Sequence, residues 1–200
     1  ISRKVNINNY LDIYGNIEKS TDIACLLFYD NFKTNINKDE KLNKSINISN
    51  IEFNDSEDSI AVIGSGNFTS SVILPSLKKT NLNIKYLISS NGLSSTILSK
   101  KYKIPITSTD VDKVLNDDKI KGVIISTRHD SHADLVIKCL NANKNVFVEK
   151  PLCLNRDELD LIKKALTNSN STVVVGFNRR FSPYSKKIKS MLGDTKSPMN

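Results

Sequence analysis

Residues 61–69, Ala-Val-Ile-Gly-Ser-Gly-Asn-Phe-Thr, carry the strongest signal for the fold of this chain. An apolar run that stops at a Gly-x-Gly pair and continues into a helix-like segment predicts a strand, a tight turn and a helix. Gly64 allows the turn, and Gly66 lets the backbone approach a pyrophosphate at the start of the helix. Thr69 stands where the dinucleotide-binding fingerprint has Gly or Ala, so we expect the helix slightly further from the strand. The incomplete fingerprint alone also fits an ordinary strand-to-helix turn.

Strand-like and helix-like segments alternate after residue 58. Strands are predicted at Ser59–Ile63, Ile84–Ile88, Val123–Ser126, Val146–Glu149 and Val173–Phe177. Apolar residues at helical spacing lie between them, around 135–140 and 159–166. Asn155 and Glu158 form a capping-box-like pair, and Asn143 is suited to a left-handed helix end. The alternation predicts an α/β fold, a Rossmann-type doubly wound parallel sheet with helices on both faces.

The flanks of this region differ from it in composition. Asn, Lys, Ser, Asp and Glu dominate residues 33–58, which is typical of a linker. Before it, a strand within Ile23–Tyr29 and a short helix or turn at Tyr10–Tyr14 cannot bury a core alone. After residue 177 the chain becomes basic and amphipathic around Tyr184–Leu192. We therefore expect a fragment in four parts: 1–33, the tail of an upstream domain; 34–58, a linker; 59–177, a nucleotide-binding domain; and 178–200, the start of a C-terminal substrate domain.

Composition narrows the class of protein. With 38% hydrophobic and 25% charged residues, the chain has neither a disordered nor a membrane composition. It opens with neither a signal peptide nor an apolar span, so a cytoplasmic location is expected. Residues 177–200 hold six Lys or Arg against one acid, which is +5 of the net charge of +8. The other lysines are scattered without interleaved aromatics, so we predict neither nucleic-acid nor membrane binding.

Cysteine usage gives no metal or disulfide signal. The three cysteines, Cys25, Cys139 and Cys153, are odd in number and widely spaced. They form neither a disulfide framework nor a zinc site by themselves, and we predict buried, unreactive thiols.

Glu149-Lys150-Pro151 ends the predicted strand at 146–149 and supplies the first catalytic candidate, Lys150. Residues just past the carboxyl ends of parallel strands face the cofactor crevice. Pro151 favours extended geometry in the residue before it, so the lysine side chain is directed rather than free. Glu149 could orient Lys150 or bind the cofactor. A surface lysine after an edge strand is the structural alternative.

Thr127-Arg128-His129-Asp130-Ser131-His132 follows another predicted strand, at the same edge of the sheet. His129, Asp130 and His132 could suggest a metal site, but no further ligand completes the set, and we predict no metal. For Asp130 and Ser131 we favour helix capping. For the two histidines, packing or capping and contact with a cofactor both stay open.

The end of the predicted strand at 84–88 lacks the carboxylate that would bind a ribose hydroxyl and favour NAD. Ser89 and Asn91 could bind a ribose there, and Lys100 or Lys101 could meet a 2′-phosphate. The choice between NAD and NADP stays open.

Four ordered motifs add a family resemblance. They are Ala-Val-Ile-Gly-x-Gly-Asn-Phe (61–68), Thr-Arg-His-Asp-Ser-His-Ala (127–133), Val-Phe-Val-Glu-Lys-Pro-Leu (146–152) and Val-Gly-Phe-Asn-Arg-Arg-Phe-Ser-Pro (175–183). With these motifs the chain resembles the Gfo/Idh/MocA oxidoreductases from about residue 59 to 192. It looks most like a two-domain branch, in which a zinc-alcohol-dehydrogenase-like unit precedes the Gfo/Idh/MocA unit.

The resemblance implies an NAD(P)-dependent dehydrogenase or reductase that acts by hydride transfer on a hydroxyl or carbonyl of a sugar, nucleotide sugar or cyclitol. Lys150 matches the family's active-site lysine, and Arg180, with Asn178, is expected to bind substrate. The expected cofactor residues are Gly64, Gly66, Asn67, Phe68, Ser89, Asn91, Ser126, Thr127, His129, His132, Glu149 and Lys150. Further catalytic residues and the contacts of a homo-oligomer are expected in the missing C-terminal domain, so the fragment should bind cofactor at best.

Two other functions are compatible with parts of the sequence. A non-catalytic nucleotide-binding or scaffolding subunit would keep the Rossmann fold without turnover. A basic nucleic-acid module would bind DNA in a strongly salt-dependent way, but the sequence offers little for it.

Overall fold

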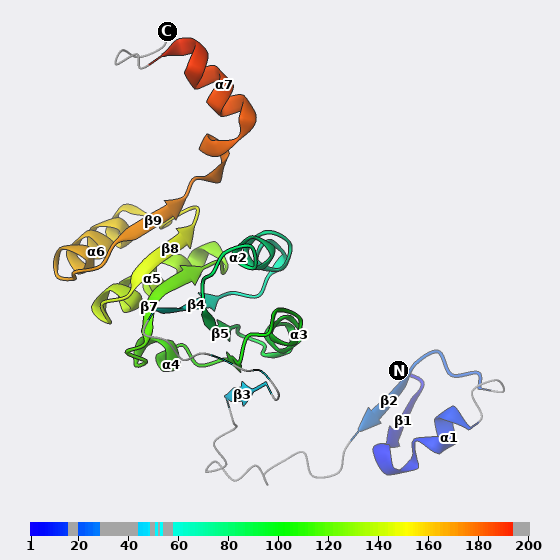
Figure 1. Ribbon diagram of the computed structural model, residues 1–200. Helices are drawn as coiled ribbons and strands as arrows, with labels where there is room; N and C mark the ends of the chain where they lie inside the picture. Colours follow the sequence, from blue (N-terminus) through cyan, green and yellow to red (C-terminus); the bar gives the residue numbers. More distant parts are fainter. Residues whose placement is uncertain (16–19, 29–43, 49–50, 52, 54–57, 194–200) are drawn as a thin grey trace. The chain divides into compact units, whose positions relative to one another are not determined.

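The computed structural model describes residues 1–15, 20–28, 44–48, 51, 53 and 58–193 (Figure 1). The chain divides into two compact units, residues 1–42 and 43–200. All the predicted site residues belong to the second unit.

A seven-stranded sheet forms the centre of the second unit. Its strands are β3 (Ser45–Asn47), β4 (Ser59–Ile63), β5 (Ile84–Ile88), β6 (Ile106–Ser108), β7 (Ile120–Ile125), β8 (Asn145–Glu149) and β9 (Val173–Gly176), in the spatial order β3-β6-β5-β4-β7-β8-β9. The six strands from β4 onward are parallel. Counted along the chain, these six stand in the order 3-2-1-4-5-6, which is that of dinucleotide-binding folds. The predicted Rossmann-type sheet is confirmed.

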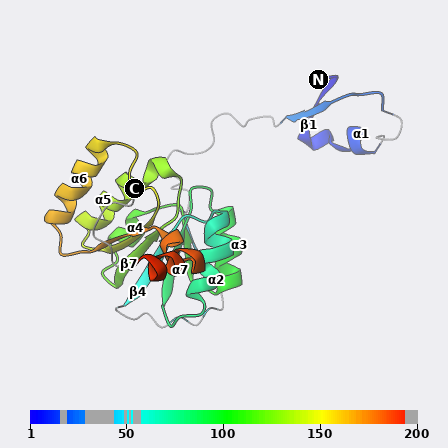
Figure 2. The same cartoon turned by 90° about the horizontal axis from the view of Figure 1, so that it is seen from above.

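Helices cover both faces of this sheet, as Figures 1 and 2 show. They are the π-helical turn η3 (Thr69–Ile73) with α2 (Leu74–Leu77), α3 (Leu93–Tyr102), α4 (Asp112–Leu115), α5 (His132–Asn141) and α6 (Arg156–Thr167). Beyond β9 come the short helix η5 (Asn178–Phe181) and α7 (Pro183–Leu192).

The core is split by the sheet into two layers because side chains alternate along each strand. Ala61 and Ile63 of β4 belong to one hydrophobic cluster with residues of α5 and α6. Val62, between them, belongs to the other cluster with Leu74 of α2 and Leu98 of α3. Every residue of β4 is buried, as expected for the central strand of a doubly wound sheet.

One edge of the sheet contains a strand that the sequence analysis did not predict. Ser45–Asn47 lies inside the segment 34–58 that we predict to be a linker, yet it forms β3 and pairs antiparallel with β6. The hydroxyl of Ser45 donates to that of Ser108 at 2.7 Å, and Ser108 donates to the carbonyl of Lys44 at 2.8 Å. The sheet is therefore parallel except at this edge, where a polar three-residue strand pairs the outer side of β6.

Two predicted helix caps are confirmed. The N–H of Glu158 donates to Oδ1 of Asn155 at 2.9 Å at the start of α6. The Glu158 carboxylate accepts from the N–H of Leu154 at 2.7 Å, so the reciprocal bond of a capping box reaches one residue further back. Beyond α5, Asn143 has a φ of +52° in the left-handed region.

The first unit is small. It contains β1 (Arg3–Asn6), the short helices η1 (Ile7–Asn9) and α1 (Leu11–Tyr14), and β2 (Cys25–Phe28), which pairs parallel with β1. The predicted strand and short helix of this region are confirmed.

The cysteines fit their prediction only in part. Cys139 is buried, and burial raises the pKa of its thiol to about 12. Cys25 and Cys153 are only half-buried, so the prediction that all three are buried is wrong for these two. Cys25 lies in a two-stranded sheet, and Cys153 lies in the turn after β8, where it packs against the margin of a hydrophobic cluster.

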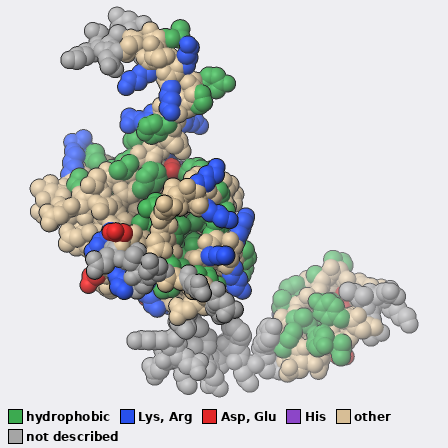
Figure 3. Space-filling model, viewed as in Figure 1, with side chains coloured by type: hydrophobic (Ala, Val, Ile, Leu, Met, Phe, Trp, Pro, Cys, Tyr) green, Lys and Arg blue, Asp and Glu red, His purple; other side chains and the backbone are tan. Residues whose placement is uncertain are grey.

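Surface charge on the second unit is mostly basic in Figure 3, where Lys and Arg side chains are dispersed over the visible face and along α7. In the described part of the chain, every helix is too short or too polar to cross a bilayer.

Candidate dinucleotide site

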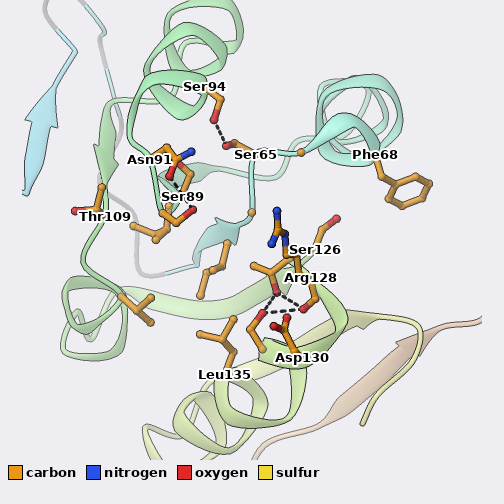
Figure 4. Close-up of a pocket in the computed structure, with 18 of the residues that line it drawn as sticks. Ser65, Phe68, Ser89, Asn91, Ser94, Thr109, Ser126, Arg128, Asp130 and Leu135 are labelled. Atoms are coloured by element: carbon orange, nitrogen blue, oxygen red, sulfur yellow. Dashed lines mark hydrogen bonds between the residues drawn. The ribbon is translucent and has the colours of Figure 1, made fainter. Parts of the chain in front are cut away.

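A cavity of about 710 Å³ opens at the carboxyl ends of β4, β5 and β7 (Figure 4). β4 lies between β5 and β7, so the connections that leave it run to opposite sides and open a crevice at this edge. The cavity is lined by Ile63, Gly64, Ser65, Gly66, Asn67, Phe68, Ile88, Ser89, Ser90, Asn91, Ser94, Thr109, Val111, Ser126, Thr127, Arg128, Asp130, Ser131, Asp134 and Leu135. Its volume is within the usual range of small-molecule and cofactor sites.

The two glycines of the loop after β4 have different roles. Gly64 has a φ of +109°, and a Cβ atom built on it would overlap the carbonyl group of Ser126. Its N–H donates to the carbonyl of Ile88 at 2.8 Å, so this glycine lets three strand ends meet closely. At Gly66 no atom of another described residue, its two chain neighbours aside, lies within 4 Å of a built Cβ. Gly64 is therefore needed by the fold, and Gly66 leaves open space that a ligand could use.

The helix after this loop begins irregularly. Asn67 accepts hydrogen bonds at its carbonyl from the hydroxyls of Ser70 and Ser71, at 3.0 and 2.6 Å. The π-helical turn η3 follows, and Pro75 in α2 has no N–H to donate to the previous turn. Thr69 is fully buried, and its hydroxyl has no partner among the described residues. Thr69, which stands where the fingerprint has Gly or Ala, is thus accommodated by the π-helical turn η3, which is wider than a turn of α-helix.

Ser89, at the end of β5, has a hydroxyl that is already engaged. It donates to the hydroxyl of Ser95 at 2.9 Å and accepts from the N–H of Gly92 at 3.1 Å. Ser95 in turn accepts from Thr107 at 2.6 Å and donates to the Gly92 carbonyl at 2.8 Å. Where a carboxylate would select NAD, this chain therefore has a buried hydroxyl network that shapes the turn into α3.

Exposed polar groups beside Ser89 remain open to the cavity. Asn91 lines it, and Ser65 and Ser94 form a hydroxyl pair at 2.5 Å that joins the glycine loop to α3 (Figure 4). Lys100 and Lys101 lie in the last turn of α3, outside the cavity and about 10 Å along the helix from Ser94. The lysines considered for a 2′-phosphate are thus remote from this wall, and serine hydroxyls line it instead.

The turn after β7 forms the opposite wall. Ser126 and Thr127 line the cavity, and the Ser131 hydroxyl lies 2.7 Å from Thr127 Oγ1 and 2.8 Å from the Arg128 carbonyl. Neither Asp130 nor Ser131 makes a side-chain cap on η4 (His129–Ser131) or α5, so the favoured capping role is wrong. A short 3-10 turn, η4, stands between the strand and α5 and turns both side chains toward the cavity.

The two histidines of this turn lie outside the cavity lining. His129 is exposed, and its ring meets that of His132 edge-on, with centroids 5.8 Å apart. His132 is fully buried, and both its ring nitrogens face backbone carbonyls. Packing or capping and contact with a cofactor were both open for the histidines, and His132 is packed inside the protein. In the described part of the chain, His, Cys, Asp and Glu side chains do not gather into a group of three that could hold a metal ion.

Glu149 is the last residue of β8 and Lys150 follows it. β8 pairs with both β7 and β9 and is therefore not an edge strand. The carboxylate of Glu149 lies over Gly176 of β9, so close that a Cβ there would be 2.8 Å from Oε1. Lys150 is exposed and joined to Pro151 by a cis peptide bond. Asn178 and Arg180 lie on η5, directly after β9. These four residues share the carboxyl edge with the cavity but do not line it.

The structure thus brings together eight of the predicted cofactor residues: Gly64, Gly66, Asn67, Phe68, Ser89, Asn91, Ser126 and Thr127. It adds residues that the sequence analysis did not place in a cofactor site, among them Ser65, Ser94, Thr109 and Asp134. Of these, only Ser65 lies within a motif that the sequence analysis recognised, the Gly-x-Gly turn. The others come from helix starts and a neighbouring turn, where no motif marks them.

Known proteins are similar to this part of the chain. The model of a family described as an oxidoreductase family with an NAD-binding Rossmann fold, GFO_IDH_MocA, matches residues 59–177. An oxidoreductase of Formosa agariphila is 30% identical over 132 residues, which are 66% of this chain and 41% of the relative. The myo-inositol 2-dehydrogenase of Thermotoga maritima is 31% identical over 132 residues, 65% of this chain and 39% of that protein. The chain thus spans about two fifths of the length of these curated relatives.

Solved structures share the fold. KijD10, a 3-ketoreductase from Actinomadura kijaniata in complex with TDP-benzene and NADP, superposes with a TM-score of 0.62 at 19% identity, over 68% of this chain and 43% of that one. GenD2 from gentamicin A biosynthesis, in complex with NAD, gives a TM-score of 0.64 at 21% identity, over 70% and 40% of the two chains.

Proposed function

The chain belongs to the Gfo/Idh/MocA oxidoreductase family, whose Rossmann fold binds NAD, and from this premise we propose that the cavity holds NAD or NADP. We propose further that the whole protein is a dehydrogenase or reductase, which transfers a hydride to or from a hydroxyl or carbonyl carbon of a sugar, nucleotide sugar or cyclitol. The observation that supports this proposal most directly is the 710 Å³ cavity at the Gly64–Gly66 turn.

The residues at this cavity fit a dinucleotide. Gly66 leaves free the space that a side chain would take, beside the start of a helix. Ser65, Asn91 and Ser94 offer hydroxyl and amide groups on the β5 side, where a ribose would lie. Among the described residues, neither a carboxylate nor a basic side chain lines that wall, so the proposal covers both NAD and NADP.

Lys150 is the proposed catalytic residue. When bound, the nicotinamide supplies hydride transfer at its C4 atom. β8 and β7 pair in register, Val148 with Ile125, so Lys150 and Thr127 of the cavity wall each lie two residues beyond this pair. In the oxidising direction, Lys150 would hold the substrate hydroxyl and take its proton as the carbinol hydrogen leaves with its electron pair. Glu149 would orient the lysine, and Asn178 and Arg180 would hold substrate oxygens.

The division of the chain is part of the same proposal. Residues 1–33 would belong to an upstream, alcohol-dehydrogenase-like domain, 34–58 would be a linker that contributes β3, and 178–200 would begin the substrate domain. The last part is supported by α7, where Tyr184, Ile188 and Met191 are exposed at the spacing of one helix face. An apolar helix face of this kind requires a covering surface. A homo-oligomer and a cytoplasmic location also stay predictions.

A lysine variant tests the proposed function in the intact protein. Lys150→Ala should lower kcat by about 100-fold or more, the size expected for loss of a general acid or base, while the Kd for NADH or NADPH changes by less than about threefold. Lys164→Ala, an exposed lysine of α6 outside the cavity, is the matched control. Turnover is followed by nicotinamide absorbance with myo-inositol and a panel of sugars.

The possible outcomes separate the candidates. Equal losses in turnover and cofactor affinity would contradict a catalytic role for Lys150. Tight cofactor binding with no turnover of any polyol or ketose would instead favour the non-catalytic nucleotide-binding subunit.

A further inference from the structure

His132 joins two turns of the carboxyl edge from inside the protein. It is the first residue of α5, and it is fully buried. Its Nδ1 lies 2.7 Å from the carbonyl oxygen of Pro151, and its Nε2 lies 3.3 Å from the carbonyl oxygen of Thr127. One carbonyl belongs to the turn after β8 and the other to the turn after β7. A single side chain therefore spans the cavity wall and the turn that carries Lys150.

The two contacts of the imidazole are not equivalent. Carbonyl oxygens only accept hydrogen bonds, and a neutral imidazole has one N–H to donate. The shorter distance assigns that N–H to Nδ1, which then donates to Pro151. In this tautomer Nε2 carries no proton, so its 3.3 Å approach to the Thr127 carbonyl oxygen is not a hydrogen bond. Removal of the Nδ1 donor would leave the partly buried Pro151 carbonyl without this bond, which costs free energy wherever water does not replace the donor.

The position of Lys150 depends on its backbone. Within the described part of the chain, its ammonium group makes no hydrogen bond or ion pair, and its side chain is exposed. On one side of it, Glu149 is held in the sheet opposite Gly176 of β9. On the other side, the Pro151 carbonyl is held by His132. The lysine is thus the one residue between two anchored neighbours.

We propose that His132 is a positioning residue, whose Nδ1–H bond to Pro151 fixes the Lys150 turn relative to the Thr127 wall of the cavity. It acts through the backbone on both sides of the reaction space and touches neither cofactor nor substrate. A reactive group must be held to within about 0.5 Å for efficient catalysis, which a free turn at the end of a strand does not ensure. The expected effect of this bond on turnover rests on the proposed catalytic role of Lys150. The hydrogen bond from His132 to Pro151, called the tether below, does not depend on that role.

Three substitutions separate this bond from packing. The side-chain amide of His132→Asn places its nitrogen where Nδ1 lies, that of His132→Gln places it near Nε2, and His132→Leu has no donor. Backbone 15N relaxation of the 200-residue chain gives order parameters for the amides of Lys150 and Leu152. We expect values of about 0.85 in the wild type and His132→Asn, and about 0.6 or less in His132→Gln and His132→Leu, with β4 and β7 unchanged.

Equal order parameters in all three variants, or changes spread over α5 and β7, would overturn the tether and leave only a packing role. If a variant does not fold, the imidazole 15N spectrum of the wild type decides. A proton on Nδ1 that exchanges slowly with solvent is expected, and a proton on Nε2 alone would overturn the assignment.

Turnover gives the second readout. In the intact protein, with myo-inositol and NAD⁺ as the probe pair, kcat should fall about tenfold or more in His132→Gln and His132→Leu. His132→Asn should stay within about threefold of the wild type, as should the KM for NAD⁺ in all three. If Lys150→Ala leaves turnover intact, the proposed function of Lys150 fails, and the relaxation data still decide whether His132 holds the turn.

Discussion

At the scale of single residues, the glycine loop separates the demands of folding from those of binding. Gly64 has a φ of +109° and lies against the carbonyl of Ser126, whereas Gly66 has an ordinary φ and faces open space. A side chain at Gly64 would push apart the turns after β4 and β7, and one at Gly66 would only occupy the cavity.

Gly64→Ala should therefore destabilise the folded chain, and Gly66→Ala should not. We expect a loss of about 3 kcal/mol or more in the free energy of unfolding for Gly64→Ala, from the positive φ and the overlap with Ser126. For Gly66→Ala the change should be within about 0.5 kcal/mol. Urea unfolding followed by circular dichroism measures both, and similar losses at the two positions would contradict the assigned roles.

Asp117 makes the second prediction at this scale, at the amino edge of the sheet. Its carboxylate lies 2.8 Å from Nζ of Lys85 and accepts from the hydroxyl of Tyr86 at 2.9 Å. Burial acts to raise the pKa of Asp117, but the bonds from Lys85, Tyr86 and the N–H of Lys119 outweigh burial and hold this pKa below its usual value.

A lowered pKa in the folded state means that Asp117 stabilises the protein fully above the unfolded pKa, about 4. That stabilisation is lost as the pH falls through the lower, folded pKa. Asp117→Asn should cost about 1–2 kcal/mol at pH 7, and the difference from the wild type should shrink below about pH 4. Unfolding free energies at pH 7, 5 and 3 test this, and a difference that does not change with pH would contradict it.

At the scale of elements, caps and edge pairings decide where helices and strands begin. The start of α6 depends on Asn155, which accepts from the N–H of Glu158 at 2.9 Å. Asn155→Ala should lower the free energy of unfolding by about 1 kcal/mol, and Asn155→Ser, which keeps a capping oxygen, should lose only a few tenths. Thermal unfolding of the two variants compares them, and equal melting temperatures would argue against the cap.

The sequence predicted those elements that carry their own apolar signal. β4 and β5 begin and end as predicted, because buried runs stop abruptly at Gly64 and Ser89. β7 begins three residues before the predicted start, at Ile120, because Lys121, which is exposed, and Gly122 interrupt the apolar pattern, and it ends one residue before the predicted Ser126. β3 and β6 were not predicted. Each has three residues with polar members, and such strands form only because a neighbouring strand offers its backbone.

The site was predictable to a similar extent. Residues two or three positions beyond a strand end, such as Gly66, Asn91 and Thr127, were placed from sequence, because parallel strands bring their carboxyl ends to one edge. Ser94, Thr109 and Asp134 were missed, because their approach to the cavity depends on how helices and turns pack. The buried position of His132 likewise needs three dimensions, since its two carbonyl partners are 5 and 19 residues away along the chain.

At the scale of the whole molecule, the second unit is a Rossmann-type sheet with a cavity at the carboxyl ends of its central strands, and the proposed reacting residues would lie beside that cavity. Its Lys150 turn, Asn178 and Arg180 share the carboxyl edge with the glycine loop. Under the proposed function, the substrate would meet the nicotinamide at this edge of the sheet.

The central claim is that this cavity binds a nicotinamide dinucleotide, and the most direct measurement is a fluorescence titration of the folded 200-residue chain with NADH and with NADPH. Wild-type chain, Gly66→Leu and the control Lys164→Leu are compared after circular dichroism shows the same fold. We predict saturable binding to the wild type and the control, weakened at least about 30-fold in Gly66→Leu, because the leucine fills the space beside the glycine loop. Equal binding in all three proteins, or no binding to the folded wild-type chain, would contradict the assignment of this cavity.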